Sequence, residues 1–288
     1  MPGHNASPAD VAGLSSSPVV AAYGGGLNST AMLLRWVTEG LPLKLILFAD
    51  TGAERPATYD QVAKMSRWLV SRGAPPIVTV RYATREGKVI TLEERCLQTK
   101  RLPSLAYGFK KCSLKFKRQP QDKYVREWAP AQEAWNDGRK VIKLIGYDAD
   151  EPHRAERAKA KYALDLKSPK PSLDARRYQY LYPLTDIWDM GRDECRDLCA
   201  SFGFCDVPKS SCIFCPSTSN AEIFRMHDTE PELLRRCLAI EANAESTTAG
   251  RGLGGQNRRW ADIIKQPRLF TDQSPPVACD CYDGGWDD

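Results

Sequence analysis

The sequence lacks the segments that carry a chain into or through a membrane. No Lys or Arg occurs in the first ten of its 288 residues, whereas a secretory signal peptide starts with basic residues. The uncharged run 11–34 is long enough to span a bilayer, but Pro18, three successive serines and Gly24-Gly25-Gly26 interrupt it. We therefore expect a cytoplasmic protein that makes no membrane contact.

The sequence also lacks a dominant charge and is poor in histidine. It has 41 Lys and Arg against 36 Asp and Glu, a net charge of +5, and only three His. Hydrophobic residues make up 42% of the chain, which is ordinary for a soluble globular protein and excludes collagen, a coiled coil and wholesale disorder. In a reducing cytoplasm, the ten cysteines are expected to be metal ligands, redox groups or buried small hydrophobes rather than disulfides.

No Gly-Lys-Ser or Gly-Lys-Thr is present, so the chain has no Walker loop, but a different glycine turn stands near its start. The apolar run 18–23 predicts a buried strand, Gly24-Gly25-Gly26 follows it, and 31–37 predicts a helix. Backbone N–H groups converge in such a turn, and the helix N-terminus adds partial positive charge. The turn therefore indicates a phosphate site; the alternative is a tight connection without a ligand.

Strands and helices alternate over the first two thirds of the chain. Further strands are predicted at 43–49, 77–82 and 141–147, with a helix beginning at Pro56. This alternation predicts an α/β fold, a twisted parallel sheet with helices on both faces of the Rossmann-like kind. Ligands bind at the carboxyl ends of the strands in such sheets. We expect the site where three strand ends carry unusual residues, at 24–30, 50–52 and 146–154.

The composition divides the chain into three parts. Residues 1–17 are expected to form a flexible tail, 18–190 a nucleotide-binding α/β domain, and 191–288 a smaller helical, cysteine-rich region with a metal site. The Lys/Ala/Pro/Ser-rich stretch 158–177 is expected to be a mobile loop, and helices are predicted at 193–202 and 229–242.

Six blocks resemble, in the same order, the phosphoadenosine phosphosulfate (PAPS) reductase-like family of PP-loop adenine nucleotide α-hydrolases. Together they cover roughly residues 18–220. Two departures stand in the first block, where Gly24 replaces the family's Ser and Asn28 replaces the Asp of many members. The blocks are 24–30, 49–59, 111–120, 146–157, 182–184 and 209–216.

The resemblance implies an adenine nucleotide α-hydrolase-like fold and an ATP-dependent activation coupled to sulfur transfer. The turn would hold the β- and γ-phosphates of ATP while an acceptor oxygen attacks the α-phosphorus, pyrophosphate leaves, and sulfur then displaces the adenylate. The expected acceptor is nucleic acid, either DNA or tRNA, and the expected sulfur donor is a protein such as a cysteine desulfurase.

Two other functions stay open at this point. One is a PAPS or APS reductase that uses thioredoxin and releases sulfite, although the segment 278–284 lacks the Glu-Cys-Gly motif of those enzymes. The other is a non-catalytic nucleotide- or nucleic-acid-binding component with a structural zinc.

The resemblance also implies the residues of the nucleotide site. Asn28, Ser29, Asp50 and Arg154 are the expected catalytic residues, and Asp50 would face the ribose or a Mg²⁺ ion. The alternatives are that Asp50 caps the following turn and that Arg154 and Arg157 are exposed helix charges. The expected nucleotide-binding residues are Gly24, Gly25, Gly26, Asn28, Ser29, Thr30, Asp50, Thr51, Gly52, Gly146, Arg154 and Arg157.

Cysteines in a C-x-x-C pair and in a basic segment suggest a metal centre. By the resemblance, Cys112, Cys212 and Cys215 would hold a [4Fe–4S] cluster, and basic neighbours would favour their thiolates. The fourth ligand is expected to be Cys281, with Cys205, Cys279 or an open iron as the alternatives. The rival is zinc held by Cys212, Cys215, Cys279 and Cys281. Four other cysteines are expected to pack in the core: Cys96, Cys195, Cys199 and Cys237.

The segment 100–118 carries seven basic residues and no acid, with Tyr107, Phe109 and Phe116 between them. Such a run usually forms a solvated face. Because the basic and aromatic residues are interleaved, we expect this segment to contact nucleic-acid phosphates.

Overall fold

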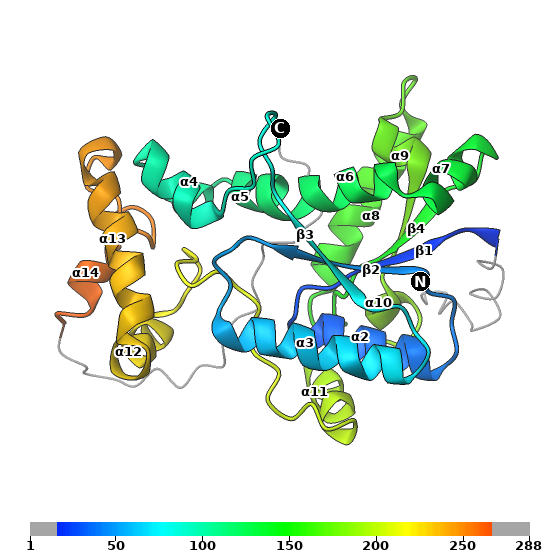
Figure 1. The fold of residues 1–288 in the computed structure, drawn as a ribbon, viewed down its shortest axis with the longest axis horizontal. Coiled ribbons are helices and arrows are strands. Elements are labelled where there is room, and N and C mark those ends of the chain that lie inside the picture. The colour runs from blue at the N-terminus through cyan, green and yellow to red at the C-terminus, as the bar shows by residue number, and fades with distance from the viewer. Residues whose placement is uncertain (1–15, 267–288) are drawn as a thin grey trace.

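A five-stranded sheet forms the centre of the computed structural model, which describes residues 16–266 (Figure 1). The strand order is β3-β2-β1-β4-β5, and every neighbouring pair is parallel. This confirms the predicted α/β parallel sheet, and the order is consistent with a Rossmann-like fold. The strands are β1 (Val19–Ala22), β2 (Leu45–Asp50), β3 (Ile77–Arg81), β4 (Val141–Leu144) and β5 (Tyr178–Leu181).

Helices connect the strands and continue beyond them. No helix within residues 16–266 is long and apolar enough to cross a membrane. The helices are α2 (Leu27–Thr38), α3 (Pro56–Ser71), α4 (Leu92–Thr99), a 3₁₀ turn η2 (Ser104–Tyr107), α5 (Lys111–Ser113), a π-helical turn η3 (Leu114–Arg118), α6 (Gln119–Glu127), α7 (Ala129–Asn136), α8 (Pro152–Lys167), α9 (Leu173–Arg177), α10 (Pro183–Asp186), α11 (Arg192–Ser201), α12 (Asn220–Thr229), α13 (Pro231–Thr248) and α14 (Trp260–Ile263).

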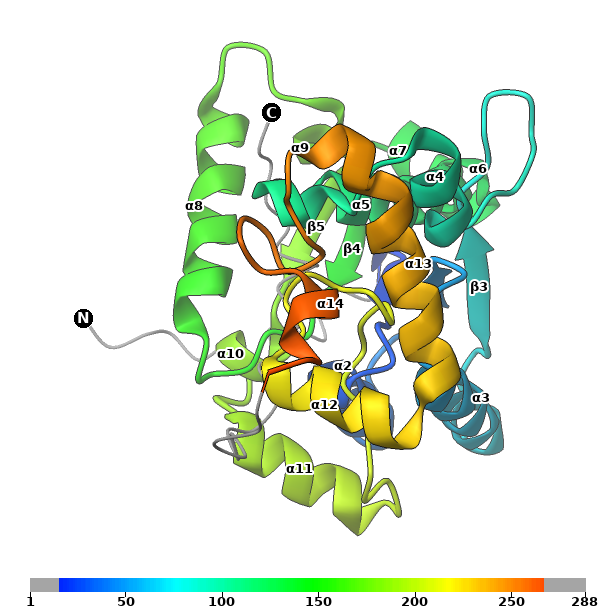
Figure 2. The same ribbon diagram turned by 90° about the vertical axis from the view of Figure 1, so that its left-hand side faces the viewer.

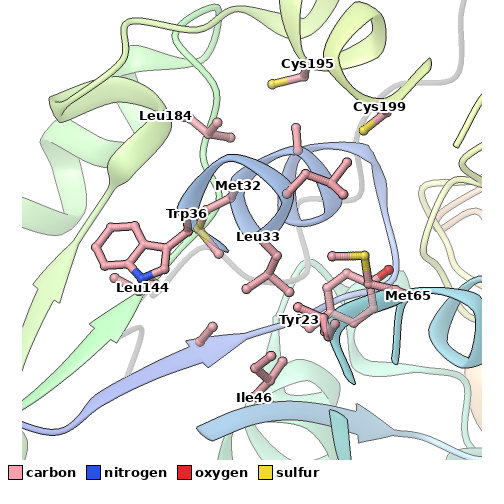
Figure 3. Close-up of a cluster of buried hydrophobic side chains, with 14 of the residues drawn as sticks. Tyr23, Met32, Leu33, Trp36, Ile46, Met65, Leu144, Leu184, Cys195 and Cys199 are labelled. Atoms are coloured by element: carbon pink, nitrogen blue, oxygen red, sulfur yellow. The ribbon is translucent and has the colours of Figure 1, made fainter. Parts of the chain in front are cut away.

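One face of the sheet is covered by α2 and α3, and α11 packs on the outer side of α2. Leu33 of α2 and Met65 of α3 are fully buried against Ile46 of β2 (Figure 3). Cys195 and Cys199 of α11 are also fully buried and face α2, so these two cysteines are core residues, as predicted. The other face is covered by α6 and α7, whose core residues pack against β1, β2 and β4.

A second core lies to one side of the sheet, where α12, α13 and α14 meet α4 (Figures 1 and 2). Cys96 and Cys237 pack in it, as predicted. The Cys212 segment joins this core to the sheet, because it pairs with Glu54 just beyond the end of β2 and Ile213 donates a backbone hydrogen bond to Ala53. Both parts of the sequence therefore contribute to one packed unit at this edge, and the boundary at residue 190 stays a prediction.

The prediction of a mobile loop at 158–177 is wrong. Helix α8 begins at Pro152 and runs to Lys167, and α9 follows before β5. Pro152 at the first position suits a helix start, and the Ala, Lys, Arg and Leu residues after it are strong helix formers. The hydroxyl of Tyr162 donates to the carbonyl of Tyr178, which ties α8 to β5.

The four predicted strands are confirmed, with ends that agree to within three residues, whereas β5 was not predicted. The helix predicted at 193–202 is α11. The helix predicted at 229–242 is confirmed as α13, which starts two residues later and runs on to Thr248. Helix α12 ends at Thr229, and α13 begins at Pro231, whose ring cannot continue the preceding helix.

We expect Leu33→Ala to lower the free energy of unfolding by about 2 to 5 kcal/mol, because it opens a cavity between α2 and the sheet. Urea denaturation measures this change. Val70→Ala, at a position that is 55% exposed on α3, is the matched control and should change stability by less than about 0.5 kcal/mol. Equal effects of the two substitutions would contradict the packing described here.

Candidate functional site

A cavity of about 400 Å³ opens at the carboxyl ends of β1 and β4. The strand order reverses between these two strands, and their connections leave on different sides of the sheet. Open α/β sheets bind ligands at such a switch point. The turn after β1, the turn after β4, α6, η3, the start of α11 and the segment 205–210 supply the walls.

The glycine turn forms one wall and delivers the N-terminus of α2 to the cavity. Gly26 is the N-cap residue, no side chain caps the helix, and its first turn carries no acid. The first intrahelical bond runs from the N–H of Thr30 to the carbonyl of Gly26, so the N–H groups of the preceding residues have no intrahelical acceptor. Leu27, Asn28 and Ser29 all line the cavity. Such an end attracts anions.

Two glycines are required by the backbone itself. Gly25 has φ +78°, and a Cβ there would lie 2.8 Å from a methyl of Thr58 on α3. A Cβ on Gly146 would lie 3.1 to 3.2 Å from the backbone of Asn28 and Ser29. The turn after β4 therefore approaches the start of α2 closely because no side chain stands between them. By contrast, a Cβ on Gly24 would make ordinary contacts.

The predicted residues of the first block divide between the cavity and the core. Gly24, Gly26, Asn28 and Ser29 line the cavity. Thr30 does not, since it is fully buried and its hydroxyl donates to the carbonyl of Gly26 while contacting the Tyr23 hydroxyl at 3.1 Å. Thr30 therefore stabilises the glycine turn from the side of the protein core, away from the cavity.

Asp148 belongs to the site and was not singled out from the sequence. Its Oδ2 accepts a hydrogen bond of 2.8 Å from Nδ2 of Asn28, and it is 1% exposed. Burial raises the pKa of Asp148, and the nearby Glu151 adds to this, while the bond from Asn28 lowers it. Oδ1 of each residue is buried and has no hydrogen-bond partner among the described residues. The sequence offered one indication of this role for Asp148, namely its position in the loop 146–154 that was predicted to border the site.

Arg154 reaches the cavity and Arg157 does not. Arg154 is 6% exposed, it pairs with Glu151 at 2.7 Å, and its guanidinium lies 4.5 Å from the ring centre of Tyr147. Tyr147 in turn stacks on Tyr182. These contacts hold the guanidinium in one orientation, so Arg154 is not an exposed helix charge. Arg157 is exposed and lies outside the cavity walls.

Asp50, Thr51 and Gly52 hold the loop after β2 together and lie outside the cavity walls. Oδ1 of Asp50 accepts from the N–H of Gly52 and the hydroxyl of Tyr59, and Oδ2 pairs with Arg81. These bonds match the alternative in which Asp50 caps the turn. The predicted role of Asp50 at the ribose or a Mg²⁺ ion stays a prediction.

Basic side chains dominate the rest of the cavity wall. Lys117, Arg192, Arg196 and Lys209 join Arg154, against one acid, Asp206. Two of them are fixed by buried acids behind the wall: Lys117 by Glu54 at 3.3 Å and Lys209 by Glu222 at 3.0 Å. Arg196 pairs with Asp193 at the surface. A single partner leaves donors on each group for a ligand. The cavity is therefore suited to an anion.

The C-x-x-C pair lies behind this wall. Cys212 is buried, its sulfur is 3.3 Å from the hydroxyl of Thr51, and Glu54 and Lys117 lie beside it. Burial raises the pKa of Cys212 well above its usual value and Glu54 adds to this, while Lys117 opposes both. Burial likewise raises the pKa of Cys215, with a smaller contribution from Cys112.

Three of the predicted metal ligands, Cys112, Cys212 and Cys215, lie within the described residues, and they do not form a metal site by themselves. Within residues 16–266, no three His, Cys, Asp or Glu side chains are grouped closely enough to hold a metal ion. Cys279 and Cys281, the other predicted ligands, lie outside the described residues. The metal centre, whether a [4Fe–4S] cluster or zinc, therefore stays a prediction, and we derive no step through either.

The basic segment 100–118 leads to the cavity. Its π-helical turn carries Lys117 to the wall, while Arg118 pairs with Asp122 and Asp174. Further out, Phe109 is 57% exposed with the Lys111 ammonium 5.6 Å from its ring centre. The part of the segment around Phe109 thus lies at the protein surface, and the part around Lys117 belongs to the cavity wall.

A comparison of the chain with models of known protein families gave no match, and neither did a search of curated proteins. The functional assignment therefore rests on the residues of this cavity.

Iodoacetamide should modify Cys205 before the buried core cysteines. Cys205 is exposed and lines the cavity, whereas burial raises the pKa of Cys96, Cys199 and Cys237 to about 12. Those three thiols stay protonated below that pH, and the thiolate is the reactive form. Peptide mass spectrometry after brief labelling at pH 8 measures the order. In urea all four should react, and native labelling of Cys199 as fast as Cys205 would contradict the structure.

Proposed function

We propose that this protein is a PP-loop-type enzyme of the PAPS reductase-like kind that binds ATP and couples adenylation of an acceptor to sulfur transfer. The observation that carries the proposal is the uncapped N-terminus of α2, which opens on a basic cavity at the β1–β4 switch point. The resemblance of six sequence blocks to that family supports the same reading.

The cavity has the two kinds of surface that a nucleotide needs. Backbone N–H groups at Gly26–Ser29, together with Arg154 and Lys209, suit the phosphates. Apolar residues also line the cavity, among them Ala22, Phe48 and Ile145, and suit the base and ribose. A cavity volume of about 400 Å³ is within the usual range for small-molecule sites.

The proposed reaction has two steps. An acceptor oxygen attacks the α-phosphorus of ATP, the bond to the β-phosphate oxygen breaks, and pyrophosphate leaves. A sulfur nucleophile then displaces AMP from the adenylated acceptor. Arg154 and the N–H groups of the turn would stabilise the charge that develops on the phosphates. Asn28 would orient the turn through its bond to Asp148.

The acceptor that we propose is nucleic acid, with sulfur supplied by a donor protein. The segment 100–118 supports this choice, because it presents basic side chains and Phe109 at the surface and places Lys117 in the cavity wall, although Phe116 is buried. A strand held by its phosphates along this segment would reach the nucleotide site.

Calorimetric titration of the full chain with ATP, followed by assays of pyrophosphate release with tRNA or DNA and sulfide, tests the proposal. We expect ATP binding and nucleic-acid-dependent pyrophosphate release. Sulfite release from PAPS with reduced thioredoxin, without pyrophosphate release from ATP, would identify a sulfonucleotide reductase instead. ATP binding with neither reaction would identify a non-catalytic binding component.

Gly24→Val should weaken ATP binding at least about tenfold, because its methyl groups would enter the cavity between Ser29 and Ser210 where a phosphate approaches. The backbone at residue 24 accepts a side chain, so the free energy of unfolding should change by less than about 1 kcal/mol. Calorimetry and urea denaturation measure the two effects.

Gly24→Ala is the size control and should weaken binding less. Gly25→Val is unsuitable for this test, because its φ of +78° and the contact with Thr58 would destabilise the fold. Full ATP affinity in a folded Gly24→Val protein would exclude the turn as the phosphate site.

A further inference from the structure

The connection between α13 and α14, residues 249–259, is a compact loop that lies outside the six blocks of the resemblance (Figure 2). It carries three Arg and no acid. The N–H of Gly252 donates to the carbonyl of Gly255, and a Cβ on Gly252 would lie 2.4 Å from Cα of Arg259, so the two arms of the loop touch. The buried carboxylate of Glu241 accepts hydrogen bonds from three backbone N–H groups of the loop and of α14. These bonds fix the shape of the loop.

The loop 249–259 packs against the basic segment 100–118, although the two are far apart in the sequence. Nη1 of Arg251 donates to the carbonyl of Ala106 at 2.8 Å, and its guanidinium carbon lies 5.4 Å from the ring centre of Tyr107. A guanidinium has five N–H donors, so this bond leaves others for a ligand. Neither segment contains an acid. The packing therefore adds Arg251 to the positive surface of the segment 100–118.

The other two arginines of the loop hold it in place. Nη2 of Arg258 donates to the carbonyl of Thr218 at 2.7 Å, and Arg259 pairs with Glu245 at 2.9 Å. We therefore assign contact with a ligand to Arg251.

Two aromatic rings lie beside cations on this surface. The ring of Phe109, which is 57% exposed, has the Lys111 ammonium 5.6 Å from its centre, and the ring of Tyr107 has the Arg251 guanidinium. Unpaired bases stack on exposed aromatic rings and on guanidinium planes, while nearby cations hold the phosphates. The bases of a duplex are already stacked on one another and cannot use such rings. The surface therefore suits a single strand.

We infer that the loop 249–259 and the segment 100–118 form one binding surface for single-stranded nucleic acid. In this surface Arg251 holds a phosphate and Phe109 stacks on a base. The inference rests on the proposed function and specifies its acceptor as an unpaired stretch of the strand. Because the same segment continues to Lys117 in the cavity wall, a strand bound here would lead to the nucleotide site.

Fluorescence anisotropy of the full-length protein tests the inference, with labelled oligodeoxythymidylate and oligouridylate of about 12 nucleotides and a duplex of the same length. The wild type should bind at least one of the single strands about tenfold more tightly than the duplex. Arg251→Gln should weaken this binding and lower the slope of log Kd against log salt by about 0.7, because one phosphate contact is lost. Phe109→Ala should weaken binding at least about fivefold and leave the slope unchanged, because it removes stacking and no charge.

The controls separate these effects from loss of charge or of folding. Arg67→Gln, at an exposed position of α3, removes one positive charge elsewhere and should behave as the wild type. Arg251→Lys keeps the charge and should keep the salt slope. Urea denaturation should show all four variants to be folded, since Phe109 and Arg67 are exposed and Arg251 is at the surface of a loop fixed by Glu241.

The outcomes separate this inference from the proposed function. Wild-type affinity and salt slope in Arg251→Gln, or equal binding of single strand and duplex by the wild type, would overturn the inference and leave ATP binding and pyrophosphate release as they are. Failure of the wild type to bind either single strand would also overturn it. Binding of a single strand as expected by a wild type that does not bind ATP would instead refute the proposed function and leave the binding surface in place.

Discussion

The close approach of two backbones is the constraint on which the site depends. The turn after β4 touches the start of α2 at Gly146, where a Cβ would lie 3.1 Å from the N–H nitrogen of Ser29. This contact brings the loops of two neighbouring strands together at the point where the strand order reverses. It leaves the N-terminus of α2 pointing at a cavity rather than at a capping side chain. The anion-binding character of the cavity follows from this packing.

Buried ion pairs behind the cavity wall connect the sheet to the second core. Glu54, next to the end of β2, pairs with Lys117 and lies beside Cys212. Lys209 pairs with Glu222, which also accepts hydrogen bonds at the start of α12. Breaking a buried pair leaves an uncompensated charge, which is costly. The cations of the wall are therefore held in place by the same contacts that dock α12 and the C-x-x-C segment.

The sequence predicted the part of the fold that depends on local pattern. Apolar runs predicted four of the five strands to within three residues, and the glycine turn was correctly placed between β1 and α2. The stretch 158–177 was predicted wrongly, because its many Lys and Ser residues suggested a loop while its helix formers decided the outcome. Local pattern also says nothing about which faces meet, so the second core between α4 and α13 could not be predicted.

The candidate site shows the same division between local and long-range information. Gly26, Ser29 and Arg154 were predicted and line the cavity, whereas Asp50 proved to be held by Gly52, Tyr59 and Arg81. Asp148 was missed, since the role of an acid in a loop depends on which residues it faces in the fold.

The hydrogen-bond partner of Asn28 is relevant to one difference between this chain and the family that it resembles. Many members of that family have Asp where this chain has Asn28. An amide at position 28 carries no charge, yet its N–H₂ group binds the buried carboxylate of Asp148 at 2.8 Å. A carboxylate therefore stands within one hydrogen bond of the helix start, supplied from the turn after β4 instead of from α2 itself. Because burial and Glu151 both raise the pKa of Asp148, the charge there depends more strongly on its surroundings than an exposed carboxylate would. An anion bound at the glycine turn would add to those surroundings and favour the protonated form of Asp148, so ligand binding and protonation at this pair should be coupled.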